Sequence, residues 1–266
     1  MDDMTTKKPV NDAPVIETRG LTMGYGAQLI QENINFKVNQ GDIFVVMGGS
    51  GCGKSTLLKH LTGLYEPVAG NILYNGVSYT CADESERQKL RSRWGVTFQS
   101  GALFSDMTLA ENIALPVRHA GIPRKETAEL VAYKLALVGL SGFEDYYPSQ
   151  ISGGMCKRAG LARAIALDPE ILFFDEPSAG LDPLSARRLD DLILNLRDST
   201  GTTVVMVTHE LASIFAIANN GIYLDAITKT WLDQGDPKWL RDHSQKDIVR
   251  SFLARGEEGS NRELME

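Results

Sequence analysis

The sequence predicts an α/β fold whose core is a mainly parallel sheet, and three observations support that prediction. The runs "GDIFVVM", "EILFFDE" and "TTVVMVTHE" are almost continuously apolar and end in polar residues, as strands covered on both faces do. A glycine-rich stretch separates the first of these strands from a helical segment over residues 53–64. Apolar residues recur at helical spacing over residues 124–140 and again at Leu189, Leu192, Ile193 and Leu196. Parallel strands bring their carboxyl ends to one edge of a sheet, where α/β proteins carry their chemistry.

Composition limits the classes of protein to consider. The chain has 266 residues, 43% of them hydrophobic, with a formal charge of −7 and a pI of about 5.2. An acidic chain repels polyanions and lacks the basic footprint of a dedicated nucleic-acid binder. Cys52, Cys81 and Cys156 form no CxxC pair, which argues against a disulfide framework and against a structural zinc site.

No segment of the sequence predicts export or a membrane span. The first 14 residues are polar and lack the apolar core of a secretory signal. The longest apolar run, over residues 211–218, is about eight residues long, whereas a helix that crosses a bilayer needs ~18–20. If the protein works at a membrane, we expect another protein to hold it there.

The chain divides into one main domain and flanking segments. We expect, in order, a polar extension, the main domain, an amphipathic extension and a disordered tail, over residues 1–14, 15–237, 238–255 and 256–266. In the main domain, β-like runs over residues 15–38 and a hairpin turn at Asn75-Gly76 predict an antiparallel β subdomain.

The stretch "GGSGCGKS" fits the phosphate-loop pattern G-x-x-x-x-G-K-[ST] and lies between a strand and a helix, as that pattern requires. Its backbone N–H groups would surround phosphates, Lys54 would reach the β- and γ-phosphates, and the Ser55 hydroxyl would ligate Mg²⁺. The alternative is a glycine-rich turn with an incidental lysine. The residues predicted to bind ATP here are Gly48, Gly49, Ser50, Gly51, Cys52, Gly53, Lys54, Ser55 and Thr56.

Three polar residues at strand ends predict hydrolysis as well as binding. Asp175 ends one apolar run and is placed to hold Mg²⁺, and Glu176 after it would orient or deprotonate the attacking water. His209 ends the next strand, where an imidazole could donate to the γ-phosphate. The alternatives are that Glu176 only begins a loop and that His209 is an ordinary packed or surface residue.

The order of "GGSGCGKS", "ISGGM", "ILFFDE", "SAGLD" and "VTHE" resembles that of an ABC-transporter ATPase over roughly residues 15–235. The resemblance implies a P-loop NTPase fold with an inserted helical subdomain, here over about 100–167. It also implies that Ser152, Gly153 and Gly154 bind the γ-phosphate of an ATP held by a second ATPase subunit. The residue types agree, because Ser152 can cap a helix whose positive end the glycines leave open to an anion.

Three further site residues follow from the resemblance. Tyr25 matches the aromatic residue that stacks on adenine, and Gln99 matches the glutamine that touches Mg²⁺ and the membrane partner. Asp182 matches the loop that contacts the opposite subunit, although Asp182-Pro183 is also an ordinary helix start. Tyr25 could instead be a strand-edge aromatic residue, and Gln99 a polar strand terminus. ATP would close a homodimer, and hydrolysis would reopen it.

Within that family, "FQSGALFSDMT" and "ISGGM" resemble the ATPases of MCE-linked phospholipid transporters of the Mla type. The resemblance implies a multipass permease, an MCE-domain protein, a small accessory cytoplasmic subunit and a place on the cytoplasmic face of a bacterial inner membrane. A small-solute importer and a lipoprotein-release system stay open as alternatives. Met155 stands where most members have glutamine, and we expect it to mark the lipid branch without altering hydrolysis.

Two other classes are less consistent with the sequence. ATPases of this type that act on ribosomes or DNA carry two cassettes, long coiled coils or zinc elements, and none of these is apparent here. A subunit that binds ATP without hydrolysing it would need neither Glu176 nor His209.

Two expectations concern Cys52 and the C-terminal extension. Lys54 and a helix N-terminus should lower the pKa of the Cys52 thiol, so that alkylation would block nucleotide binding. Trp239, Leu240, Ile248, Val249, Phe252 and Leu253 should lie on short amphipathic helices. These helices could dock on a partner or pack on the chain's own core.

Overall fold

The computed structural model describes residues 14–25, 28–99 and 101–262, except for the side chains of Tyr25 and residues 256–262. The extension expected over residues 1–14 thus lies almost wholly outside the described residues. Within the main domain, all residues except 26–27 and 100 are described.

The core sheet has six strands in the order β10-β9-β3-β8-β7-β6. Its strands are β3 (Ile43–Gly48), β6 (Trp94–Thr97), β7 (Ile171–Asp175), β8 (Thr203–Val207), β9 (Asn220–Asp225) and β10 (Thr230–Gln234). All neighbours pair in parallel except β9 and β10, which are antiparallel. The mainly parallel core predicted from the apolar runs is confirmed.

A second, antiparallel sheet has the strand order β2-β1-β4-β5. Its strands are β1 (Ile16–Tyr25), β2 (Gln28–Val38), β4 (Ala69–Tyr74) and β5 (Val77–Ser78). The turn between β4 and β5 holds Asn75 and Gly76 at φ values of 48° and 80°. Two consecutive left-handed residues form the hairpin turn that Asn-Gly favours, which confirms the antiparallel β subdomain.

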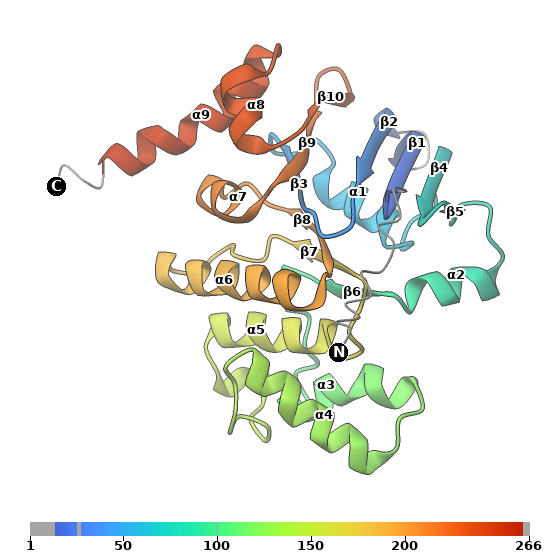
Figure 1. The fold of residues 1–266 in the computed structure, drawn as a ribbon, viewed down its shortest axis with the longest axis vertical. Coiled ribbons are helices and arrows are strands. Elements are labelled where there is room, and N and C mark those ends of the chain that lie inside the picture. Colours follow the sequence, from blue (N-terminus) through green and yellow to red (C-terminus); the bar gives the residue numbers. More distant parts are fainter. Residues whose placement is uncertain (1–13, 26–27, 100, 263–266) are drawn as a thin grey trace, which may run out of the picture.

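The helices lie on both sides of the core sheet. They are α1 (Lys54–Leu61), α2 (Glu84–Arg91), α3 (Leu109–His119), α4 (Arg124–Leu137), α5 (Gly153–Ala164), α6 (Pro183–Thr200), α7 (Leu211–Ile217), α8 (Pro237–His243) and α9 (Asp247–Arg262), with a 3-10 turn η1 (Pro148–Gln150). Figure 1 shows α3, α4, α5 and α6 on one side and α1 with the antiparallel sheet on the other. The helical subdomain over about 100–167 thus corresponds to α3, α4 and α5.

Side chains of β3 alternate between two hydrophobic clusters, one on each face of the core sheet. Val45 and Met47 belong to the cluster shared with the helical subdomain, α6 and α7. Phe44 and Val46 belong to the cluster shared with α1 and the antiparallel sheet. Because both faces are covered, the strand reads as a continuous apolar run and its polar chemistry is confined to its end.

None of the helices in the described part of the chain is long and apolar enough to span a membrane.

The C-terminal helices pack on the core through part of their apolar surface. Leu240, Val249 and Leu253 are fully buried in the cluster of the helical side. Trp239, by contrast, is 54% exposed and Ile248 is 43% exposed. Packing on the core therefore accounts for only some of the apolar positions. Helix α9 continues to Arg262, which differs from the disordered tail expected from residue 256.

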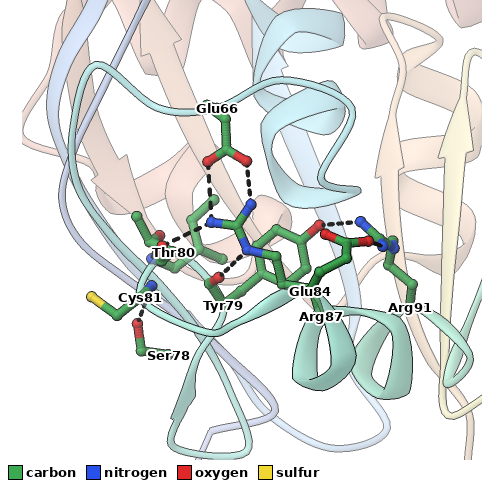
Figure 2. Close-up of polar contacts among 9 residues, drawn as sticks. Glu66, Ser78, Tyr79, Thr80, Cys81, Glu84, Arg87 and Arg91 are labelled. Atoms are coloured by element: carbon green, nitrogen blue, oxygen red, sulfur yellow. Dashed lines mark hydrogen bonds and ion pairs between the residues drawn. The ribbon is translucent and has the colours of Figure 1, made fainter.

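Arg87 fixes α2 to neighbouring loops (Figure 2). Its guanidinium pairs with Glu66 in the loop after α1 and donates to the carbonyl oxygens of Tyr79, at 3.1 Å, and Thr80, at 2.9 Å. Leu90 is the one buried residue of α2. The helix is therefore held by these charge-assisted hydrogen bonds together with the buried Leu90.

Asp190 gives a testable pH dependence of stability. It lies on α6 with 6% of its surface exposed, and Ser213 donates to its Oδ2 at 2.8 Å. Burial raises the pKa of Asp190 to about 6, and the Ser213 hydroxyl offsets part of this rise. A carboxyl whose pKa is higher in the folded state destabilises the fold as pH rises from about 4 to about 6.

Asp190→Asn should therefore increase the free energy of unfolding at pH 7 by up to about 3 kcal/mol, but hardly at pH 4. Denaturant unfolding at both pH values measures this, with exposed Asp145→Asn as the control; an equal effect at both values would contradict it.

Candidate active site

The phosphate loop joins β3 to α1, and two of its glycines adopt backbone conformations that other residues rarely adopt. Gly48 has φ 145°, and a Cβ there would lie 2.4 Å from the Leu224 carbonyl oxygen of β9. Gly53 caps α1 in the left-handed region at φ 96°. Lys54 begins α1, and its Nζ donates to the carbonyl oxygens of Gly48, at 2.9 Å, and Gly49, at 3.0 Å. The ammonium is thus held over the loop that would receive phosphates.

Ser55 and Asp175 meet at the carboxyl end of the core sheet although 120 residues separate them. The Ser55 hydroxyl donates to Asp175 Oδ1 at 2.9 Å. Two hard oxygen atoms beside the phosphate loop fit Mg²⁺. In the described ranges no three His, Cys, Asp or Glu side chains gather into a metal site, so nucleotide phosphates and water would complete the coordination. When bound there, Mg²⁺ would neutralise charge on the β- and γ-phosphates.

Glu176 and His209 are paired at the ends of two adjacent strands, β7 and β8. The Nδ1–H of His209 donates to Glu176 Oε1 at 2.9 Å. The other oxygen, Glu176 Oε2, is buried and has no hydrogen-bond partner among the described residues. Glu176 also has φ 51°, and its N–H donates to the Val207 carbonyl of β8 at 2.8 Å. The carboxylate is therefore fixed at one oxygen by the imidazole, while its other oxygen is buried and unpaired.

Gln99 and Tyr25 are placed less completely. Gln99 is exposed two residues beyond β6, beside the strand that ends in Asp175. The structure puts the two residues at the same sheet edge but gives no contact between them. Tyr25 ends β1, and its side chain lies outside the described residues, so its adenine-stacking role stays a prediction.

The residues assigned to a partner's nucleotide form a separate, exposed surface. Ser152 caps α5, with its hydroxyl accepting from the Met155 N–H at 3.2 Å, and Gly153 and Gly154 open the helix. No acidic residue occupies the first turn of α5, so its positive end is free of a neutralising carboxylate. Asp182 caps α6 and is exposed, and the hydrogen bond from Ser185 lowers the pKa of its carboxyl.

Lys157 is a site residue that the sequence did not reveal. From α5, its Nζ donates to the backbone carbonyls of Ala179 and, at 3.4 Å, of Glu176. Burial lowers the pKa of the Lys157 ammonium. It thus holds the loop between Glu176 and Asp182 against the helix that carries Ser152. The only signal in the sequence was a lysine two residues after Met155, and its carbonyl partners carry no side-chain pattern.

The expectation that the pKa of the Cys52 thiol is lowered is wrong. Its side chain is 1% exposed, and burial raises the pKa of the thiol, outweighing the opposite effect of Lys54. In the nucleotide-free protein, iodoacetamide should modify Cys52 at least about tenfold more slowly than exposed Cys81, because a buried thiol reacts only after local opening. Timed alkylation with peptide mass spectrometry measures both rates. Faster modification of Cys52 would contradict the buried position.

Met155 packs against the hydrophobic cluster of the helical side. Only its backbone takes part in the cap of α5, through the bond to Ser152. Met155→Gln should therefore leave the rate of ATP hydrolysis within about tenfold of the parent, a barrier change of ~1.4 kcal/mol. Steady-state phosphate release measures this, and a complete loss of turnover would show that the side chain has a direct role.

Comparison with known proteins places the chain in a family. The family model described as ABC transporter matches residues 31–179, more than half of the chain. The intermembrane phospholipid transport system ATP-binding protein MlaF of Haemophilus influenzae is 41% identical over 206 residues, which are 77% of this chain and 78% of that protein. Two other relatives are named for different substrates. The probable ribonucleotide transport ATP-binding protein mkl of Mycobacterium tuberculosis is 39% identical over 90% of this chain, and the methionine import ATP-binding protein MetN of Brucella abortus is 38% identical over 93%.

This chain spans 66% of the length of each of those last two proteins. Among solved structures, the dimeric bacterial ABC transporter cassette MJ0796 matches with a TM-score of 0.76 at 28% identity, covering 83% of this chain and 98% of that one. The same cassette in a post-hydrolysis state with ADP and phosphate matches with a TM-score of 0.74. The family model, the MlaF relative and the shared fold show that this chain belongs to the ABC transporter family, as an ATPase domain.

Proposed function

We propose that the chain is the ATP-hydrolysing subunit that powers a membrane transporter of phospholipids. The observation that carries the hydrolytic part is the Glu176–His209 pair, joined at 2.9 Å beside the Ser55–Asp175 contact. A module that only bound nucleotide would not need a second carboxylate fixed at the end of β7. Family membership makes ATP the expected nucleotide and supports Mg²⁺ as its companion.

The chain's own residues divide the work of hydrolysis. Lys54 and the N–H groups of the phosphate loop bind the phosphates, while Ser55, Asp175 and Gln99 are the residues that would hold Mg²⁺. Glu176 is the carboxylate that takes a proton from the attacking water, and His209 binds its Oε1 at 2.9 Å. His209 keeps that carboxylate oriented and, being 60% exposed, is accessible to the γ-phosphate.

A second copy of the chain is the partner that completes the site. Ser152, Gly153 and Asp182 are exposed, so they are available to another subunit. The MJ0796 structure is described as a dimer, which supports the same arrangement here. ATP held by one copy would then join the α5 N-terminus of the other, and hydrolysis would remove that link.

We propose that a membrane permease binds to a groove beside β6. This groove has a volume of about 1040 Å³ and is formed by α2, β6, the end of α3, the end of α5 and the three residues Phe98, Ala102 and Phe104. Phe98 and Phe104 line it and are 37% and 52% exposed. An open groove with aromatic side chains fits an inserted helix of a membrane protein. Such docking would hold the chain at the cytoplasmic face of a bacterial inner membrane.

Phospholipid is the proposed cargo because the MlaF relative is named for intermembrane phospholipid transport. By the same relationship we propose an MCE-domain protein and a small accessory subunit as further partners, and no nucleic acid. The MetN relative gives a competing proposal, a small-solute importer, with the same site chemistry.

Affinity purification of the full chain from detergent-solubilised membranes tests the proposal. We expect a multipass membrane protein and an MCE-domain protein to copurify, with phospholipid identified by mass spectrometry of the complex. A permease that copurifies with a periplasmic solute receptor and no lipid would favour the importer. Recovery with ribosomes or DNA, and never with membrane proteins, would overturn the transporter proposal altogether.

A further inference from the structure

The guanidinium of Arg163 joins the end of α5 to the loop that follows Gln99. Its Nη1 donates to the Ala102 carbonyl oxygen at 2.9 Å and its Nη2 to the Gly101 carbonyl oxygen at 3.2 Å. Burial lowers the pKa of Arg163, and no described carboxylate is near enough to contribute to that change. A half-buried cation is thus satisfied by two backbone oxygens of a single loop.

The backbone of this loop is shaped to present those two oxygens. Gly101 has φ 76° and Ala102 has φ 47°, so two consecutive residues adopt the left-handed conformation. For alanine this conformation is unfavourable by about 1 kcal/mol or more. A loop that only connected β6 to α3 would not need an alanine in the left-handed conformation. The hydrogen bonds from Arg163 offset the unfavourable free energy of that conformation.

The loop also touches α5 backbone to backbone. A Cβ on Gly160 would lie 2.9 Å from the Gly101 carbonyl oxygen and 3.1 Å from Gly101 Cα. A Cβ on Gly101 would in turn lie 3.0 Å from the Cys156 carbonyl oxygen. Because the two backbones are in contact on one side and held by Arg163 on another, the loop has little freedom to move without the helix.

Arg163 joins α5 to the loop after Gln99, and these two segments are proposed to contact different nucleotides. The loop begins with Gln99, on the chain's own phosphate side, while the opposite end of α5 presents Ser152 to a partner's nucleotide. An α-helix of this length is a rigid rod of roughly 18 Å. Arg163 also lines the groove proposed for the permease, together with Phe98 and Phe104. A partner bound in that groove would therefore contact the point where the loop and α5 meet.

We propose that Arg163 is a positioning residue that fixes the Gln99 loop to α5, so that Gln99 and Ser152 move as one body. The inference rests on the proposed function for its consequence, since only an ATP-bridged dimer uses both residues together. The clamp itself depends on the hydrogen bonds and backbone contacts alone. The two parts are therefore tested separately.

The first test uses hydrogen–deuterium exchange on the nucleotide-free full chain. Arg163→Gln should raise amide exchange over residues 98–105 by at least about tenfold, because the loop loses both bonds to α5. Arg158→Gln is the matched control: this arginine of the same helix donates to the Val138 and Gly139 carbonyls at 3.0 and 3.3 Å and does not touch the loop. Unchanged exchange in Arg163→Gln, or the same increase in Arg158→Gln, would overturn the clamp.

The second test measures ATP-driven dimerisation by sedimentation in a Glu176→Gln background with Mg²⁺ and ATP. Arg163→Gln should weaken dimerisation at least about tenfold while the affinity of the monomer for a fluorescent ATP analogue stays within about twofold. Gly160→Ala, which keeps the guanidinium but pushes the loop from the helix, should act in the same direction, and Arg163→Lys should restore part of the loss. Parent-like dimerisation by Arg163→Gln would refute the linked movement. If the Glu176→Gln parent itself does not dimerise with ATP, the proposed function fails, and the linked movement of Gln99 and Ser152 fails with it. The exchange measurement would still show whether Arg163 holds the loop to α5.

Discussion

Glu176→Gln should lower the rate of ATP hydrolysis by at least about a hundredfold while nucleotide binding is retained, because a general base contributes ~10²- to 10⁴-fold. Glutamine keeps the size of the side chain and can still accept the bond from His209 Nδ1. A neutral amide, however, cannot act as the general base that takes a proton from water. Phosphate release under saturating Mg²⁺ and ATP measures the loss, and sedimentation should show a dimer that persists with ATP.

The control for that substitution is Glu210→Gln. The Glu210 carboxylate lies 3.8 Å from the other nitrogen of His209, so it shares the imidazole but not the position at the end of β7. We expect its turnover to stay within a few-fold of the parent, roughly the effect of a surface charge. Normal turnover in Glu176→Gln would show that the catalytic carboxylate is another residue.

Lys54→Met should raise the dissociation constant for ATP by at least about a hundredfold. Two charge-assisted hydrogen bonds to phosphate are lost, each worth about 1.5–3 kcal/mol, and ~1.4 kcal/mol is a tenfold change in affinity. Titration with a fluorescent ATP analogue measures the change. Lys59→Met is the matched control, because Lys59 is on the same helix but lies over the Tyr65 ring, 5.4 Å from its centroid. Equal loss of affinity in both variants would point to a damaged α1 in place of a lost phosphate contact.

Much of the site was predictable because its residues follow local patterns. Asp175 ends β7 and Glu176 follows it, while His209 lies two residues beyond β8, the strand that the structure places beside β7. The phosphate loop needs glycines at fixed spacing between a strand and a helix, which leaves a clear trace in the sequence. The same is true of Ser152, since serine is a favoured residue at the N-cap of a helix and here accepts from the Met155 N–H.

The parts that could not be predicted depend on contacts between distant segments. The local surroundings of Cys52 indicated an accessible thiol with a lowered pKa, but β9 and the phosphate loop itself bury the side chain. Lys157 and Arg163 act on backbone carbonyl oxygens, which every residue has and no pattern marks. The end of α9 was missed because a charged, glycine-containing segment reads as a solvated tail.

The position of Lys54 bears on how tightly the protein can hold a nucleotide. Its four-carbon side chain is already immobilised by the Gly48 and Gly49 oxygens. Ordering a free lysine side chain opposes binding by about 1.5–2 kcal/mol, and here that loss of rotamer freedom has occurred during folding. An arriving triphosphate exchanges partners with an ammonium that is in place, so the association is entropically less unfavourable than with a mobile lysine.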